Sequence, residues 1–323
     1  MKENLDQANT LRRIMSNRKS SGPIGKSRQG PLVMTVASGK GGVGKSSFVA
    51  NIGALLARQG IRTLLIDGDL GLANLDILLG VHASHTLEDV LNGTSPLQQA
   101  IVGIEPNLWL IPAASGFLEI REANEQTRNK LIHLFENCPW EIDLILVDVG
   151  AGIQENVLSL HNPTYLSAVV LTPEPTSFTD AYGLIKLLRR DKGITHVQII
   201  VNQVTDGREG QLIFQKLKEV ASRFIDVQMD YLGHWQRDEK ITQAVMKRKI
   251  LLDLDQQAPS IPSLELLAKR VKSKLSSQFS SDEKDHVRSL TVKTSSRFME
   301  EPARGAPGNI AGFWRTLLGE VKA

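Results

Sequence analysis

Gly39-Lys40-Gly41-Gly42-Val43-Gly44-Lys45-Ser46 is the stretch that decides the fold of this chain. It follows the apolar run 32–37, which predicts a buried strand, and precedes 47–57, whose length and spacing predict a helix. A strand, a glycine-rich loop ending in Gly-Lys-Ser and a helix form the pattern of a phosphate-binding loop. The alternative is a glycine-rich turn without a ligand, but the lysine, the serine and both flanking elements all fall where a phosphate site needs them.

The chemistry of this loop follows from its residue types. Glycines let backbone N–H groups approach a phosphate, and the N-terminus of the following helix adds partial positive charge. We expect Lys45 to reach the β- and γ-phosphates of a nucleotide and the Ser46 hydroxyl to bind Mg²⁺.

Apolar strands alternate with helical stretches from residue 31 to about residue 275. Such strands predict an α/β fold, a mainly parallel sheet with helices on both faces, whose ligands bind beyond the carboxyl ends of the strands. The predicted strands are 32–37, 62–67, 108–112, 143–148, 168–172, 197–202 and 231–233, and the predicted helices include 47–57, 129–135, 180–190 and 212–224.

Three further polar positions lie at the ends of predicted strands. Asp67 opens the loop 67–76, which also carries Asp69, and Asp148 is followed by a Gly-Ala-Gly segment. Carboxylates placed in this way bind Mg²⁺, often through water, and orient an attacking water. Each aspartate alone is a weak signal because aspartates often occur in turns. Together with the phosphate loop and Asn202, they predict one site at one edge of the sheet.

The loop and the acidic segments resemble a known family. Residues 40–46 (KGGVGKS) are similar to the deviant Walker A motif of the MinD/ParA class of P-loop ATPases, whose mark is an extra lysine, here Lys40. The resemblance implies a homodimer formed face to face with ATP, in which Lys40 contacts the partner's nucleotide and stabilises transition-state charge. It assigns catalysis to Lys40, Lys45 and Asp69, Mg²⁺ binding to Ser46, Asp67 and Asp148, and ATP binding to Gly39, Lys40, Gly41, Gly42, Val43, Gly44, Lys45, Ser46, Ser47 and, at the adenine, Asn202.

The N-terminal residues 1–30 form a polar arm, and a motif in this arm resembles one particular group within the class. Residues 6–12 (DQANTLR) resemble the DQAxxLR motif of one group within the class, the flagellar number regulators FlhG (FleN), and 172–182 is similar to another segment of that group. This implies activation of FlhF, a GTPase related to the signal-recognition particle, and contacts with flagellar switch (C-ring) components. Composition alone indicates a disordered tail equally well. The motif residues are Asp6, Gln7, Leu11 and Arg12.

The C-terminal residues change character twice. Residues 276–307 are rich in serine and charge and indicate a flexible linker, whereas 308–323 regain helical spacing. Six apolar residues form one stripe there, which could dock on the domain or lie in a membrane interface, where Trp314 is at home. We expect one tail to bind lipid weakly and the two tails of an ATP-bound dimer to bind well by avidity. The stripe comprises Ile310, Phe313, Trp314, Leu317, Leu318 and Val321.

Composition limits the remaining choices. The single cysteine, Cys138, cannot form an internal disulfide, favours a cytoplasmic setting, and argues against relatives that bridge a metal cluster through cysteines. A net charge of +3 is too mild to indicate nucleic acid as a partner. We expect a cytoplasmic protein that is peripheral on the cytoplasmic membrane with ATP bound. Two alternatives stay open: a division or partition ATPase with the same core, and an ATP-binding scaffold with little turnover.

Overall fold

The computed structural model describes residues 31–69, 74–112, 133–134, 141–154, 157–158, 160–161 and 166–275. The arm 1–30, the linker 276–307 and the tail 308–323 lie outside the described residues, as does most of the predicted helix 129–135, of which 133–134 are helical. All described elements belong to the domain between the arm and the linker.

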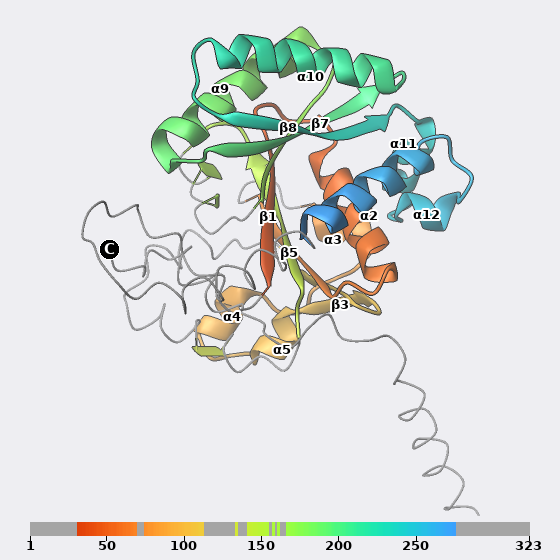
Figure 1. Ribbon diagram of the computed structural model, residues 1–323. Coiled ribbons are helices and arrows are strands. Elements are labelled where there is room, and N and C mark those ends of the chain that lie inside the picture. Colours follow the sequence, from red (N-terminus) through yellow and green to blue (C-terminus); the bar gives the residue numbers. More distant parts are fainter. Residues whose placement is uncertain are drawn as a thin grey trace, which may run out of the picture.

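One eight-stranded sheet organises the domain, with strand order β3-β4-β2-β5-β1-β6-β7-β8 (Figure 1). All neighbouring strands pair in parallel except β3 and β4, so the predicted α/β fold with a mainly parallel sheet is confirmed. The strands are β1 (Leu32–Ser38), β2 (Thr63–Gly68), β3 (Val102–Glu105), β4 (Leu108–Ile111), β5 (Leu144–Ala151), β6 (Leu166–Leu171), β7 (His196–Val204) and β8 (Gln228–Gln236).

The seven predicted strands are all present, and β3 is the strand that sequence reasoning missed. β3 is short, lies at the edge of the sheet, and keeps its side chains partly exposed. It therefore has no continuous apolar run, because burial on both faces is what makes the central strands apolar. Its antiparallel pairing with β4 follows from the tight turn at Asn107, whose φ is 66°.

Helices cover both faces of the sheet, as predicted (Figure 1). On one face α4, α5, α9 and α10 pack on the strands, and on the other face α2, α3, α11, α12 and the helical residues 261–275 do so. The bounds are α2 (Lys45–Arg58), α3 (Leu75–Leu79), α4 (Leu87–Leu91), α5 (Leu97–Ala100), α9 (Pro175–Lys192), α10 (Gly207–Ser222), α11 (Glu239–Met246) and α12 (Leu251–Leu254).

Helix α9 begins five residues before its predicted start. Pro175 stands in the first turn, where the missing N–H of proline costs nothing, and Glu174 is the N-cap. The helix ends at Lys192, and its C-cap is Gly193, whose φ of 66° suits glycine. The earlier start matters for function, because it places the N-terminus of α9 directly beyond β6, the parallel neighbour of β1.

No helix within the described ranges combines the length and the apolar character that crossing a bilayer requires.

Candidate functional site

The loop that joins β1 to α2 has the shape of an anion cradle. Gly42 and Gly44 adopt φ angles of 78° and 83°, a left-handed conformation that favours glycine over residues with a Cβ. Gly44 is the N-cap of α2 and has no side chain with which to cap the helix. The first N–H groups of α2 therefore face the loop and suit an anionic ligand such as a phosphate.

Lys45 lies buried at the base of this cradle and pairs with Asp148. Its Nζ is 2.5 Å from Asp148 Oδ1, and the two side chains are 7% and 1% exposed. Burial raises the pKa of Asp148, and the adjacent lysine opposes that shift. The pair joins the first turn of α2 to the end of β5 and places an ammonium group directly below the phosphate loop.

Asp67 lies beside Asp148 at the ends of adjacent parallel strands. The two residues are register partners in the β2–β5 pairing, and both are 1% exposed. Asp67 accepts N–H hydrogen bonds from Asp69 at 3.2 Å, Asn74 at 2.9 Å and Leu75 at 3.0 Å. Burial, with a smaller contribution from Asp148, raises the pKa of Asp67 to about 6.

These donors suit a magnesium ion that a nucleotide helps to hold. Ser46 hydrogen-bonds the Asp148 carboxylate, so one hydroxyl and two carboxylates converge below the loop. Oxygen donors of this kind match Mg²⁺, which usually keeps waters and phosphate oxygens among its ligands. Within the described residues, this site included, no group of three or more His, Cys, Asp or Glu side chains gathers as a site held by protein ligands alone would require.

Asp69 lies at the rim of the same site. A Cβ built on Gly150 would be 3.5 Å from the Asp69 carboxyl carbon, so the loops after β2 and β5 touch at this point. The half-buried carboxylate is thus next to the segment that follows Asp148. This position is compatible with the predicted task of orienting a water.

Lys40 lies on the surface, over the N-terminus of α9. Its Nζ is 2.6 Å from Glu174 Oε2 and 3.0 Å from Thr176 Oγ1. The Lys40 and Glu174 side chains are 39% and 59% exposed. Sequence reasoning did not assign Glu174 or Thr176 to the site. Their position after a predicted strand was a signal, but only the adjacency of β1 and β6 brings them to Lys40.

Asn202 braces the loop from behind. Its Nδ2 donates to the Val43 carbonyl at 2.7 Å, and its Oδ1 accepts the Gln203 N–H at 2.8 Å. A Cβ on Gly44 would lie only 2.4 Å from Asn202 Nδ2, so the contact needs glycine there. Gln203 adopts a φ of 60°, which is strained for a residue with a Cβ. The bracing role is a finding, and contact with adenine remains a prediction.

The structure brings most of the predicted site together at the carboxyl edge of the sheet. Residues 39–47 form the loop and the first turn of α2, and Asp67, Asp69, Asp148 and Asn202 surround them. Val149, which directly follows Asp148, is fully buried in the core. The partner-activating residues Asp6, Gln7, Leu11 and Arg12 and the six tail residues lie outside the described part of the chain.

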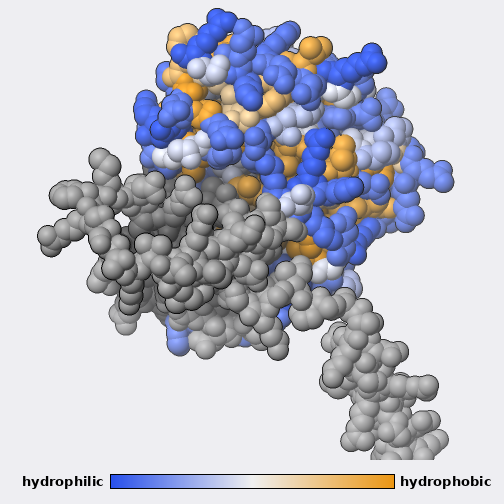
Figure 2. All heavy atoms as spheres, viewed as in Figure 1, coloured by the Kyte–Doolittle hydropathy of each residue, from blue (hydrophilic) through white to orange (hydrophobic). Residues whose placement is uncertain are grey.

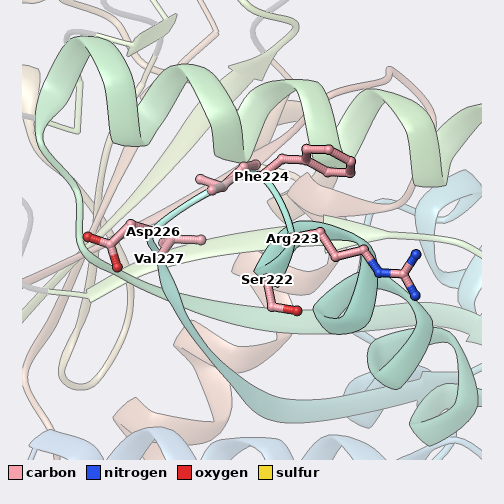
Figure 3. Close-up of a pocket in the computed structure, with 6 residues that line it drawn as sticks. Ser222, Arg223, Phe224, Asp226 and Val227 are labelled. Carbon is pink, nitrogen blue, oxygen red and sulfur yellow. The ribbon is translucent and has the colours of Figure 1, made fainter.

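A hollow at the opposite edge of the sheet is separate from this site. The segment 222–227, which leads from α10 into β8, lines it, and Figure 3 shows Arg223 and Asp226 directed to opposite sides. Phe224 is 74% exposed there. The face of the described domain that Figure 2 shows is mainly hydrophilic, with interspersed apolar side chains. Because β8 runs parallel to β1, the hollow lies at the amino ends of the strands, away from the phosphate loop.

A family model matches most of the chain. The model described as ParA, NUBPL iron-transfer P-loop NTPase, matches residues 31–272, which include all the strands of the sheet and the helices from α2 to α12.

Three individual proteins show the same likeness. The antiactivator FleN of Pseudomonas aeruginosa is 36% identical over 241 residues, covering 75% of this chain and 86% of FleN. The flagellum site-determining protein YlxH of Helicobacter pylori is 32% identical over 276 residues, covering 84% of this chain and 91% of YlxH. The solved structure of the MinD cell division protein of Aquifex aeolicus is 28% identical with a TM-score of 0.57, covering 75% and 97% of the two chains.

Proposed function

Because the chain belongs to the ParA/MinD family of P-loop NTPases, we propose that it is an ATP-driven switch that regulates flagellar number or placement. ATP favours a membrane-bound homodimer, and slow hydrolysis returns monomers to the cytoplasm. One observation supports the nucleotide chemistry above all: the buried Lys45 beneath the glycine loop, between carboxylates that end β2 and β5. The names of the two flagellar relatives support the pathway.

Each residue of the site has a definite task in this proposal. Bound Mg·ATP supplies the phosphoryl group for transfer and a cation that balances its charge. The N–H groups at the start of α2 hold the phosphates, and Ser46, Asp67 and Asp148 hold the cation directly or through water. With that cation bound, Asp148 would no longer need Lys45 to balance its charge. Lys45 is then available to the phosphates, because the carboxylate no longer depends on it.

Hydrolysis needs a water and a second positive charge. Asp69 orients the water in this proposal, which its position beside Gly150 at the rim of the site supports. Lys40 of the partner subunit offsets the charge that develops on the phosphate oxygens, which is effective in a site that excludes water. Turnover is therefore coupled to dimerisation, since one subunit alone lacks that cation.

The tail and the arm connect the switch to its targets. The apolar stripe at 308–323 binds the membrane weakly as one copy and well as two, so ATP controls attachment through avidity. Stronger pelleting with liposomes in ATP than in ADP, at equal protein concentration, tests this part. The motif at 6–12 activates the GTPase FlhF, with Gln7 orienting the water that attacks GTP.

The experiment that tests the pathway is GTP hydrolysis by purified FlhF in the presence of the full chain. We expect stimulation by the wild-type chain and its loss with Gln7→Ala. The variant Asn9→Ala is the matched control, because Asn9 stands at a variable position of the same motif. Stimulation that survives Gln7→Ala contradicts the proposed role of the arm. No stimulation by the wild type at all contradicts the flagellar assignment and leaves the ATPase.

A non-enzymatic scaffold would also bind ATP through this loop. Measurable ATP turnover that Asp69→Ala slows, while the ATP-dependent dimer persists in sedimentation, separates the proposed switch from the scaffold. A dimer without turnover favours the scaffold.

A further inference from the structure

Lys40 cannot reach a partner's nucleotide while its ammonium group is held by Glu174 of its own chain. We infer that Glu174 is a positioning residue, which keeps Lys40 in cis in the monomer and thereby weakens ATP-dependent dimerisation. The inference rests on the proposed function, because Lys40 has a second nucleotide to reach only if the dimer forms.

The backbone of Lys40 is held firmly, so only its side chain has to move. Ser38 Oγ donates a hydrogen bond to the Lys40 carbonyl at 2.9 Å. Gly39 packs so closely on α9 that a Cβ there would lie 2.3 Å from the carbonyl group of Asp180. These contacts fix the position of the Lys40 backbone, and the ion pair with Glu174 fixes the position of its ammonium group. Loss of the ion pair releases the ammonium group without unfolding the loop.

Glu174 uses its carboxylate on Lys40 and not on its own helix. It is the N-cap of α9, yet its side chain makes no capping hydrogen bond. A helix N-terminus carries partial positive charge, which disfavours a nearby ammonium group. The carboxylate offsets that repulsion. Once its charge is removed, the helix end and the ammonium group repel each other, and the hydrogen bond to Thr176 is the remaining contact described for the Lys40 ammonium group.

The exposure of the pair sets the size of the effect. Ion pairs as exposed as this one contribute little, so the cis position lowers the availability of Lys40 by about two- to threefold in each protomer. A symmetric dimer requires the release of both lysines. The two contributions multiply, and the dimer dissociation constant changes by about four- to tenfold.

Sedimentation equilibrium of the full chain with Mg²⁺ and a non-hydrolysable ATP analogue tests the inference. We expect Glu174→Gln to lower the dimer dissociation constant by about four- to tenfold. Thr176→Val should shift it in the same direction by less, and it provides a second variant with an unchanged N-cap. Asp191→Asn is the matched control, because Asp191 is an acidic residue at the other end of α9 that pairs with Arg190.

Two further readouts distinguish positioning from a general structural effect. In a Lys40→Ala background, Glu174→Gln should change the dimer dissociation constant by less than twofold, because its target is absent. The difference between wild type and Glu174→Gln should also shrink in about 1 M salt, where exposed ion pairs are screened.

The outcomes separate the inference from the proposed function. A wild-type chain that dimerises with the analogue while Glu174→Gln dimerises equally or less well overturns the inference alone. An equal gain from Glu174→Gln with and without Lys40 overturns it as well. A wild-type chain that stays monomeric at every accessible concentration with the analogue overturns the proposed function, and the inference with it.

Discussion

Two lysines of one loop, five positions apart, occupy opposite environments. Lys45 is buried against Asp148 at the centre of the sheet, whereas Lys40 is exposed and pairs with Glu174 at the end of α9. The distances are alike, at 2.5 and 2.6 Å, but the energetics are not. A buried pair that loses one partner leaves a charge that water cannot reach, and an exposed pair leaves a charge that water solvates at once. Without nucleotide, the first pair therefore stays closed as part of the domain, whereas the second is suited to open and close.

The largest expected difference between the two lysines is in stability. Lys45→Met leaves the buried Asp148 carboxylate without its partner and should lower the free energy of unfolding by about 3–4 kcal/mol at pH 7. The loss cannot exceed about 4 kcal/mol at pH 7, because Asp148 can bind a proton instead of remaining charged. Binding that proton costs about 1.36 kcal/mol for each pH unit above the pKa of the carboxyl group in the unfolded chain. Urea denaturation without nucleotide measures it.

Controls on this stability difference come from the other lysine and from pH. Lys40→Met should change the free energy of unfolding by about 0.5 kcal/mol or less. The loss with Lys45→Met should shrink at pH 5, where the carboxylate is easier to protonate, and adding Asp148→Asn should recover part of it. Equal losses for both lysines would break the comparison.

The next largest difference is in nucleotide binding. Lys45→Met should weaken binding of Mg·ADP by about 100-fold or more, because the phosphates lose a charge-assisted donor in a site shielded from water. Lys40→Met should leave binding to the monomer within about threefold, because its ammonium group is held away at Glu174. Isothermal titration calorimetry of Mg·ADP binding to both variants measures this difference. A strong loss with Lys40→Met would show that Lys40 serves its own nucleotide.

The smallest expected effect concerns Asp67, the other buried carboxylate. Its pKa is raised to about 6, so the folded chain binds its proton more tightly than the unfolded chain. Stability is therefore reduced above pH 6, and this reduction disappears as pH falls towards 4. Asp67→Asn removes the buried charge but also weakens part of the hydrogen bonding at this position. The net result should be a rise in the free energy of unfolding of about 1–2 kcal/mol at pH 7.5. The gain should fade below pH 5.

Thermal and urea unfolding of Asp67→Asn across pH 4–8 provides the measurement. Asp76→Asn is a suitable control, because Asp76 lies in the first turn of α3, near Asp67 in sequence but outside the site. A gain that is constant with pH would mean that burial of the Asp67 charge is not its cause.

Local pattern was enough to predict the loop, the central strands and the acidic strand ends. The glycines within residues 39–47 determine the backbone geometry of the loop. The strands are apolar because helices cover both faces of the sheet. The resemblance to the MinD/ParA class and its FlhG (FleN) group is confirmed by the relatives found. Such features need no knowledge of which strand lies beside which.

Pairings between distant segments could not be predicted in the same way. The contact of Lys40 with Glu174 spans 134 positions and exists only because β6 lies next to β1. The contact of Lys45 with Asp148 likewise depends on β5 being the other neighbour of β1. Strand β3 was missed for a related reason, because its pairing with β4 and not its own composition makes it a strand.

The brace from Asn202 to the Val43 carbonyl has a consequence for synthesis of the protein. The two residues are 159 positions apart, so a ribosome that adds roughly 5–20 residues per second makes the brace about 8–32 s after the loop. Asp148 also emerges late. A nascent chain therefore carries its phosphate loop long before that loop has its support, and competence to hold nucleotide arrives only when β7 joins the sheet.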